Sequence, residues 1–280
     1  MTAIQPSNLI RRKVTPDDYH FYHTIDLPGL GEMPGEIDLR NAPDEYLGNI
    51  IVTNKRVLDM GTANGFLTFY MEKKGASLVS YDFSPNDDLA IVPHPGKAAN
   101  DLISERRNRI RKINNAYRLS HRLLNSRAEL VRGTLFAIPD LVKPVDITTF
   151  GSILQHVSNP LLALQQAARI TRETIVITAM LNNTRPPIID RLFGRLATST
   201  MRKIRHRFTG PPVASESLAA VDPFEETGGQ LTPERLDDFL YALGFGDVRI
   251  NYHRQHVARH DKPLLMYTLV ANRTESMQSV

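Results

Sequence analysis

The segment 57–65, which reads Val-Leu-Asp-Met-Gly-Thr-Ala-Asn-Gly, constrains the fold of this chain most strongly. Apolar residues lead to the acid Asp59, and two glycines four positions apart, Gly61 and Gly65, follow it. Glycine adopts backbone conformations that other residues avoid, and it lets a ligand approach the backbone closely. The pattern therefore predicts a buried strand over 56–60, a tight turn at its carboxyl end and a helix directly after the turn.

The turn departs from two other glycine-rich motifs. The dinucleotide fingerprint Gly-x-Gly-x-x-Gly would need glycine where this chain has Ala63, and Phe66 stands in place of its last glycine. A phosphate-binding P-loop would need Gly-Lys-Ser/Thr after the turn, and that triplet does not follow. The turn therefore disfavours a nicotinamide cofactor and excludes a P-loop, while an ordinary strand-to-helix turn without a ligand is the alternative.

Beyond this turn, short β-branched runs alternate with helical patterns, which is typical of βαβ units around a parallel sheet. The expected strands cover 56–60, 77–81, 129–132, 145–150, 174–178, 248–252 and 264–270, the last two as an antiparallel edge hairpin. The expected helices cover 66–74, about 98–127, a segment that begins at Pro160 after a cap at Ser158 or Asn159, and 232–244. The sequence predicts an α/β fold with a doubly wound, mostly parallel sheet of seven strands.

Two segments interrupt this rhythm. Residues 1–48 are rich in proline, glycine and aromatic residues and show no sustained periodicity, so we interpret them as an N-terminal arm or cap. Residues 49–280 then form the main domain, which contains the inserted helix at about 98–127. Paired prolines and glycines indicate a helical lid or substrate insertion at about 183–230.

The composition of the chain limits which chemical groups, location and partners we expect. The chain has no cysteine, which excludes disulfides, thiolate nucleophiles and zinc-thiolate centres. No signal-peptide pattern begins the sequence, and no apolar run approaches the roughly 20 residues that cross a bilayer, so we expect a cytoplasmic protein without a membrane partner. Eight Arg or Lys residues and no acid occupy 106–127, and a second basic stretch covers 185–207. A solvated helix face is one interpretation, and an anionic substrate or RNA is the other.

A second acid completes the motif. Asp82 ends the second predicted strand, where an acid of a doubly wound sheet accepts hydrogen bonds from a ribose diol. With the turn after Asp59, it resembles the class I S-adenosylmethionine-dependent methyltransferases over residues 50–182. The resemblance implies an enzyme with a Rossmann-like methyltransferase fold and S-adenosyl-L-methionine as its cofactor.

The resemblance also implies which residues hold this cofactor. Asp59 and the turn through Gly61, Ala63 and Gly65 would face its amino-acid part. Asp82 with Phe83 would face the ribose and adenine. The remaining implied cofactor contacts are Thr134, Leu135 and Gly151.

Residues 146–160, together with Phe21-Tyr-His23 and Met33-Pro-Gly35, narrow the resemblance further. They are similar to the branch that contains the tRNA wobble-uridine carboxymethyl transferases and related small-molecule methyltransferases. A substrate does not follow from the fold alone.

Histidines are the candidate catalytic groups. His156 follows the fourth predicted strand at the edge where open α/β sheets bind ligands, and an imidazole can take a proton from an acceptor. The alternative is that His156 packs and caps the next helix. His23, in the arm, is the second candidate, with a structural role as its alternative. His253, His256 and His260 lack carboxylates at metal-ligand spacing, so we expect solvent-exposed histidines and no metal site.

The predicted function is methyl transfer from S-adenosylmethionine to a small-molecule acceptor, at oxygen or nitrogen rather than carbon. Tyr22, Tyr117 and His121 are the candidate substrate residues, with simple packing as the alternative for the last two. A tRNA or RNA methyl or carboxymethyl transferase is the second hypothesis, in which nucleic acid is the partner. A catalytically silent binding protein that keeps the cofactor fold is the third, and the sequence carries no signal for an oligomeric state.

Overall fold

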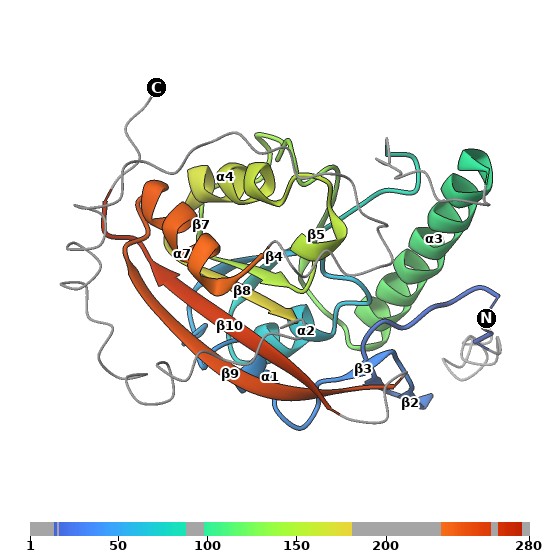
Figure 1. Cartoon of the computed structure of the whole chain (residues 1–280). Helices are drawn as coiled ribbons and strands as arrows, with labels where there is room; N and C mark the ends of the chain where they lie inside the picture. Colours follow the sequence, from blue (N-terminus) through green and yellow to red (C-terminus); the bar gives the residue numbers. More distant parts are fainter. Residues whose placement is uncertain (1–13, 16, 88–97, 181–230, 259–262, 276–280) are drawn as a thin grey trace.

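The computed structural model describes residues 14–15, 17–87, 98–180, 231–258 and 263–275 (Figure 1). The insertion predicted at about 183–230, the second basic stretch and His260 lie outside the described residues.

The core of the molecule is an eight-stranded sheet with the order β3-β9-β10-β8-β7-β4-β5-β6. Five of its strands run parallel: β4 (Arg56–Met60), β5 (Ser77–Asp82), β6 (Glu129–Arg132), β7 (Val145–Gly151) and β8 (Thr171–Met180). The C-terminal hairpin of β9 (Asp247–Val257) and β10 (Leu264–Asn272) continues the sheet, with β10 antiparallel to β8. All seven predicted strands and the antiparallel hairpin are confirmed.

The eighth strand comes from the arm. β3 (Ile37–Asp38) pairs antiparallel with the end of β9, where Ile37 lies opposite Val257. Both side chains are buried, so the pairing closes the end of the β9 ladder over apolar contacts. A strand of two residues shows no alternation, which is why the sequence predicted seven strands rather than eight.

Helices cover both faces of the sheet (Figure 1). On one face lie α4 (Pro160–Ile170) and α7 (Pro233–Ala242), and on the other lie α1 (Pro43–Tyr46), α2 (Phe66–Lys73) and the long α3 (Ala99–Leu123). Of the two predicted caps of α4, Asn159 is the one that acts, because its Oδ1 accepts a hydrogen bond from the Leu162 N–H at 3.0 Å. Among the described residues no helix is long and apolar enough to pass through a bilayer.

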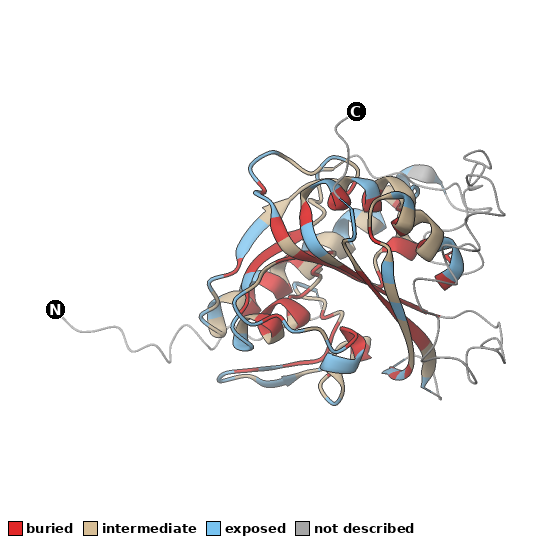
Figure 2. Cartoon of the chain, turned by 90° about the vertical axis from the view of Figure 1, so that its left-hand side faces the viewer, coloured by how far each residue is buried: buried red, intermediate tan, exposed pale blue. Residues whose placement is uncertain are grey.

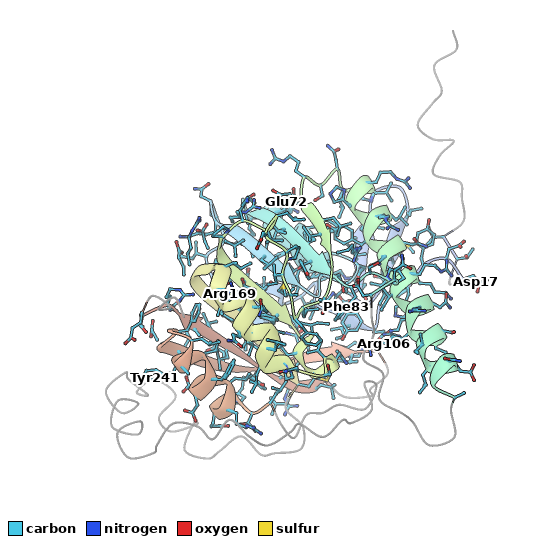
Figure 3. All side chains as sticks on the ribbon, turned by 90° about the horizontal axis from the view of Figure 1, so that it is seen from above. Asp17, Glu72, Phe83, Arg106, Arg169 and Tyr241 are labelled. Carbon is cyan, nitrogen blue, oxygen red and sulfur yellow. The ribbon has the colours of Figure 1, made fainter. Side chains whose placement is uncertain are left out.

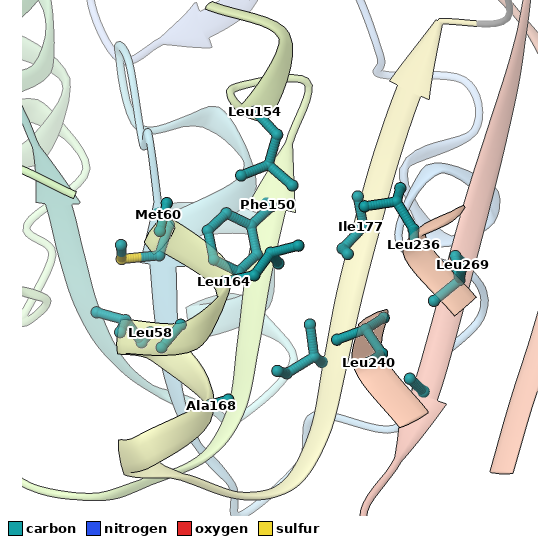
Figure 4. Packing of buried hydrophobic residues seen from close by; sticks show 14 of the residues in the cluster. Leu58, Met60, Phe150, Leu154, Leu164, Ala168, Ile177, Leu236, Leu240 and Leu269 are labelled. Atoms are coloured by element: carbon teal, nitrogen blue, oxygen red, sulfur yellow. The ribbon is translucent and has the colours of Figure 1, made fainter. Parts of the chain in front are cut away.

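Two apolar layers hold these helices against the sheet. Leu58, Met60 and Phe150 from the strands pack against Leu164 of α4 and Leu236 of α7 (Figure 4). The opposite layer joins strand residues to α1 and α2, and includes Val57, Leu78, Ile147, Leu67 and Met71. The central strands are therefore buried on both faces, as Figure 2 shows by their red colour.

A third apolar cluster joins the arm to the main domain. In the arm, β1 (Ile25–Leu27) and β2 (Gly31–Met33) form a small antiparallel hairpin. Phe21 and Leu27 from this region pack with Phe69 of α2 and with Leu119 of α3. The arm and α3 are thereby held beside the carboxyl edge of the parallel strands.

Candidate cofactor and acceptor site

The turn after β4 has the backbone conformation that its glycines predict. Gly61 has φ +78° and Gly65, at the N-terminus of α2, has φ +88°. Ala63 between them also has a positive φ of +51°, which is uncommon for a residue with a side chain. A Cβ at Gly61 would lie 2.7 Å from the Ile153 side chain. The turn therefore brings its bare backbone to the cavity wall.

Asp82 closes the other side of this turn. Its Oδ2 accepts a hydrogen bond from the Ala63 N–H at 2.8 Å, and its Oδ1 accepts one from the Phe83 N–H at 2.7 Å. Each carboxylate oxygen can accept a further bond, so two backbone donors fix the group without exhausting it. Burial raises the pKa of Asp82, and the charge of Arg132 is the strongest opposing influence.

A cavity lies over the turn, between the carboxyl edge of the sheet, the arm and α3. Its empty volume, which includes the space at its open mouth, is about 1040 Å³. Figure 3 labels Phe83 and Arg106, which lie on two of its walls. Its lining consists of Tyr22, Glu36, Gly61, Ala63, Asp82, Phe83, Arg106, Arg109, Ile110, Ile113, Asn114, Gly151, Ser152, Ile153 and His156. Seven residues predicted from the sequence therefore meet at one cavity.

Asp59 lies beneath the turn rather than at the cavity. Its side chain is buried, and it accepts hydrogen bonds from Thr68 Oγ1 at 2.7 Å and Thr149 Oγ1 at 2.9 Å. Burial raises the pKa of Asp59, and the threonine hydroxyls oppose that rise. The carboxyl group thus joins β4, α2 and β7 under the backbone that faces the cavity.

His156 lines the cavity from a short 3₁₀ turn, η2 (Leu154–His156), that follows β7. Its backbone carbonyl accepts a hydrogen bond from the Arg106 guanidinium at 3.3 Å, which links this turn to α3. The alternative in which His156 caps α4 is wrong, because Asn159 fills that position.

His23 connects the arm to the turn through its backbone. The His23 N–H donates to Asn64 Oδ1 at 2.7 Å, and Asn64 Nδ2 donates to the His23 carbonyl at 3.0 Å. The His23 ring is buried between Tyr22 and Phe66, with centroids 4.9 and 6.0 Å away. Burial lowers the pKa of His23 to about 4, so the imidazole is neutral at pH 7. Tyr22 reaches the cavity lining, whereas His23 stands behind it.

Tyr117 and His121 lie outside the cavity lining. The Tyr117 hydroxyl donates to Ser80 Oγ at 2.7 Å, and its ring packs on Phe69 of α2. His121 Nε2 is 3.1 Å from the carbonyl oxygen of Ala128. One turn apart on α3, both residues face α2, which matches the packing alternative.

The loop after β6 holds Thr134 and Leu135, which the resemblance implied as cofactor contacts. Leu135 is completely buried in the core, and the Thr134 carbonyl accepts a hydrogen bond from the Tyr81 hydroxyl at 2.9 Å. Neither residue is part of the cavity lining, whereas Gly151 is.

An ionic cluster on the cavity wall was not predicted from the sequence. Glu36 Oε1 accepts hydrogen bonds from Arg109 at 2.5 Å and from His20 at 2.6 Å. Burial alone would raise the pKa of Glu36, but the bonds from His20 and Arg109 hold it at about 2. A signal for Arg106 and Arg109 did exist, since Ile110 and Ile113 follow them at helical spacing on the same face. No comparable pattern marks Glu36.

Of the two histidines in β9, one is buried and the other is exposed. His253 is buried, contrary to the prediction, with its Nε2 2.8 Å from Thr268 Oγ1 and its Nδ1 3.1 Å from Gln255 Nε2. His256 is exposed as expected. Within the described ranges, no cluster of three His, Asp or Glu side chains could bind a metal ion.

Comparison with known proteins identifies the class. Residues 38–214 match the model of a family described as a methyltransferase domain, and the chain belongs to this family. With its sheet order and cavity at the carboxyl edge, the protein is a class I S-adenosylmethionine-dependent methyltransferase, and S-adenosylmethionine is its cofactor. The match does not confirm the tRNA wobble-uridine branch. A comparison with curated proteins gave no match.

Solved structures similar to this chain include three methyltransferases. Magnesium protoporphyrin IX methyltransferase from Synechocystis PCC 6803 is 12% identical over 84% of this chain and 82% of its own, with a TM-score of 0.48. A SAM-dependent methyltransferase from Aquifex aeolicus is 15% identical over 83% and 90%, with a TM-score of 0.46. A putative RNA methyltransferase from Pyrococcus horikoshii is 12% identical over 84% and 85%, with a TM-score of 0.45. At these identities no acceptor is transferred to this chain.

Proposed function

We propose that this protein methylates a small molecule, at oxygen or nitrogen, inside the cavity that also holds the cofactor. The observation that carries the proposal is the shape of this cavity. One wall is the glycine turn with Asp82, and the facing walls are α3 and the arm, which leave room for a small acceptor beside the cofactor.

The residues of the turn fit the cofactor. Gly61 and Ala63 offer backbone without obstructing side chains, and Asp82 offers carboxylate oxygens to the ribose hydroxyls. Phe83 offers an apolar surface beside them for the adenine. The bound cofactor supplies an electrophilic methyl carbon on a sulfonium, so no covalent intermediate with the protein is needed. The protein's contribution is then to position the acceptor and to remove its proton.

His156 is the proposed proton acceptor. It lies on the cavity wall after β7, and its backbone carbonyl accepts a hydrogen bond from Arg106. A neutral imidazole can accept the proton of a hydroxyl, amine or acid nucleophile. This favours an oxygen or nitrogen acceptor. We propose a structural role for His23, because its neutral ring lies behind Tyr22.

The walls around the acceptor are mixed in character. Ile110, Ile113 and Ile153 make much of the lining apolar, while the Arg106 guanidinium adds a positive charge. The acceptor that fits best is therefore a small, partly apolar molecule with an anionic group. In the same proposal, residues 1–48 form the arm over the cavity, and about 183–230 form the substrate insertion.

RNA is a second candidate because α3 exposes arginines on its outer side. Arg107, Arg111, Arg118 and Arg122 are all exposed. Several neutralised phosphates would give binding that falls steeply with salt. Filter binding of total tRNA at 50 and 200 mM salt separates the candidates. Submicromolar binding that collapses at the higher salt, with methyl incorporation into the RNA, would replace the small-molecule proposal.

The proposal is tested with cofactor that carries a radioactive methyl group and a cell extract separated into small molecules and RNA. We expect the label to appear in the small-molecule fraction, and to be lost with the Asp82→Ala variant. Label in neither fraction, despite cofactor binding, would favour the catalytically silent protein.

A further inference from the structure

Arg132, the last residue of β6, has an unusual environment. Its Nε, Nη1 and Nη2 atoms are all shielded from solvent, and none has a hydrogen-bond partner among the residues that the structure describes. A guanidinium cannot lose its proton in a protein, so the charge remains. An uncompensated buried charge is strongly unfavourable, and a chain that retains one needs a nearby opposite charge.

Asp82 on the neighbouring strand is that opposite charge. β5 and β6 are parallel, and Asp82 lies directly opposite Arg132 in their register. Ser80, two residues before Asp82, shares its face of the sheet and accepts the hydrogen bond from Tyr117. The Arg132 Cζ lies 5.7 Å from the centroid of the Tyr117 ring. The guanidinium therefore lies on the same face as the Asp82 carboxyl group, covered by Tyr117.

We propose that Arg132 is a positioning residue for cofactor binding, whose buried charge keeps Asp82 ionised at the cavity wall. An ionised Asp82 can accept a further hydrogen bond at each oxygen, besides those from the Ala63 and Phe83 N–H groups, whereas a protonated one would lose an acceptor site to its own proton. The inference rests on the proposed function in which Asp82 holds the cofactor ribose.

The surrounding charges agree with this role. Burial raises the pKa of Asp82, Arg132 is the largest influence that lowers it, and the backbone N–H groups of Phe83 and Ala63 follow. Asp59 on β4 pushes the pKa of Asp82 upward. The other groups that face Arg132 are Asp87 in the loop after β5, and Tyr117 and Arg118 on α3. Arg118 is exposed, so water screens its charge.

Calorimetric titration of the full chain with S-adenosylhomocysteine between pH 5.5 and 8.5 tests the inference. We expect nearly constant affinity for the wild type. In Arg132→Gln the affinity should approach the wild-type value at high pH, fall as the pH drops below the raised pKa of Asp82, and level off about 10- to 100-fold lower, the loss expected for Asp82→Ala. Binding by this variant should also release a proton to the buffer, seen by comparing buffers of different ionisation heat. Arg132→Lys should restore the wild-type profile.

Two further variants make the test specific. Arg132→Met provides a second neutral side chain if Arg132→Gln folds poorly. Adding Asp82→Asn to either variant should abolish the pH dependence, because the titrating group is gone. A loss of affinity that is the same at every pH, or no loss at all, would overturn the role of Arg132. Failure of the wild type to bind would instead refute the proposed place of Asp82.

Discussion

Asp59 and Asp82 stand near the ends of neighbouring strands, yet only Asp82 reaches the cavity. The resemblance to class I methyltransferases implied that both acids are cofactor residues. Asp59 is the penultimate residue of its strand and points to Thr68 and Thr149, whereas Asp82 is the last residue of its strand and meets the turn. A sequence can place an acid near the end of a strand. Whether its side chain then points into the core or toward a cavity depends on the neighbouring elements.

At the same scale, we predict the effect of His156→Ala. Turnover should fall on the order of 100- to 10,000-fold if His156 is the general base, while the affinity for S-adenosylhomocysteine changes little. Steady-state rates with the identified acceptor and calorimetric affinities measure the two effects. His256→Ala, at an exposed position of β9, is the matched control. An unchanged rate in His156→Ala would leave this residue a packing role only.

Among the elements, α3 shows what a helical pattern can and cannot predict. On its inward face Leu102 and Tyr117 are buried. The sequence left open whether its basic residues form a solvated face or meet an anionic partner. In the structure Arg106 and Arg109 line the cavity. A sequence gives the direction of a side chain around the helix axis, but not whether a cavity or solvent lies on that side.

The arm is the element that the sequence described least. Its strands are too short to show a period, and its position depends on the paired hydrogen bonds between His23 and Asn64. A side chain that satisfies two backbone groups of a distant segment leaves no repeating pattern. By contrast, the parallel strands follow one another with helices between them, and this alternation predicted their positions from the sequence.

We predict that Asn64→Ala loosens the arm. The substitution leaves the N–H and carbonyl of His23 buried and unsatisfied, which costs about 1–3 kcal/mol for each group. Limited proteolysis should therefore cut residues 14–40 faster in the variant, and cofactor affinity should fall because the arm borders the cavity. Asn41→Ala, at an exposed arm position, is the control and should be cut at the wild-type rate. Equal cutting of both variants would show that apolar packing alone holds the arm.

For the whole molecule, two buried histidines make stability depend on pH. Burial lowers the pKa of both His23 and His253 to about 4, below the ordinary value of 6.5. Both rings are neutral in the native protein, whereas the unfolded chain takes up protons as the pH falls below 6.5. The stability that these neutral rings provide is complete above pH 6.5 and is lost down to about pH 4, on the order of 3 kcal/mol for each ring.

Urea unfolding at pH 7, 5.5 and 4 measures this loss. Burial raises the pKa of Asp59 and Asp82, so protonation of these acids stabilises the native protein as the pH falls and offsets part of the loss. The pH profile of the wild type is therefore compared with the profiles of variants. As the pH falls, the free energy of unfolding of the His253→Gln variant should decrease less steeply than that of the wild type. The variant His256→Gln, at an exposed position, should follow the wild type. Parallel pH profiles for wild type and His253→Gln would contradict the assignment. Glu36, with a pKa of about 2, adds a separate loss between about pH 4.5 and 2.

The most direct test of the cofactor site is calorimetric titration with S-adenosylhomocysteine. Hydrogen bonds to a charged group contribute about 1.5–3 kcal/mol, so Asp82→Ala should bind this ligand roughly 10- to 100-fold more weakly than the wild type. Asp44→Ala, at an exposed carboxylate of α1, should bind normally, and NAD should not compete. A wild type that does not bind the ligand, or an Asp82→Ala variant that binds it as tightly as the wild type, would contradict the account.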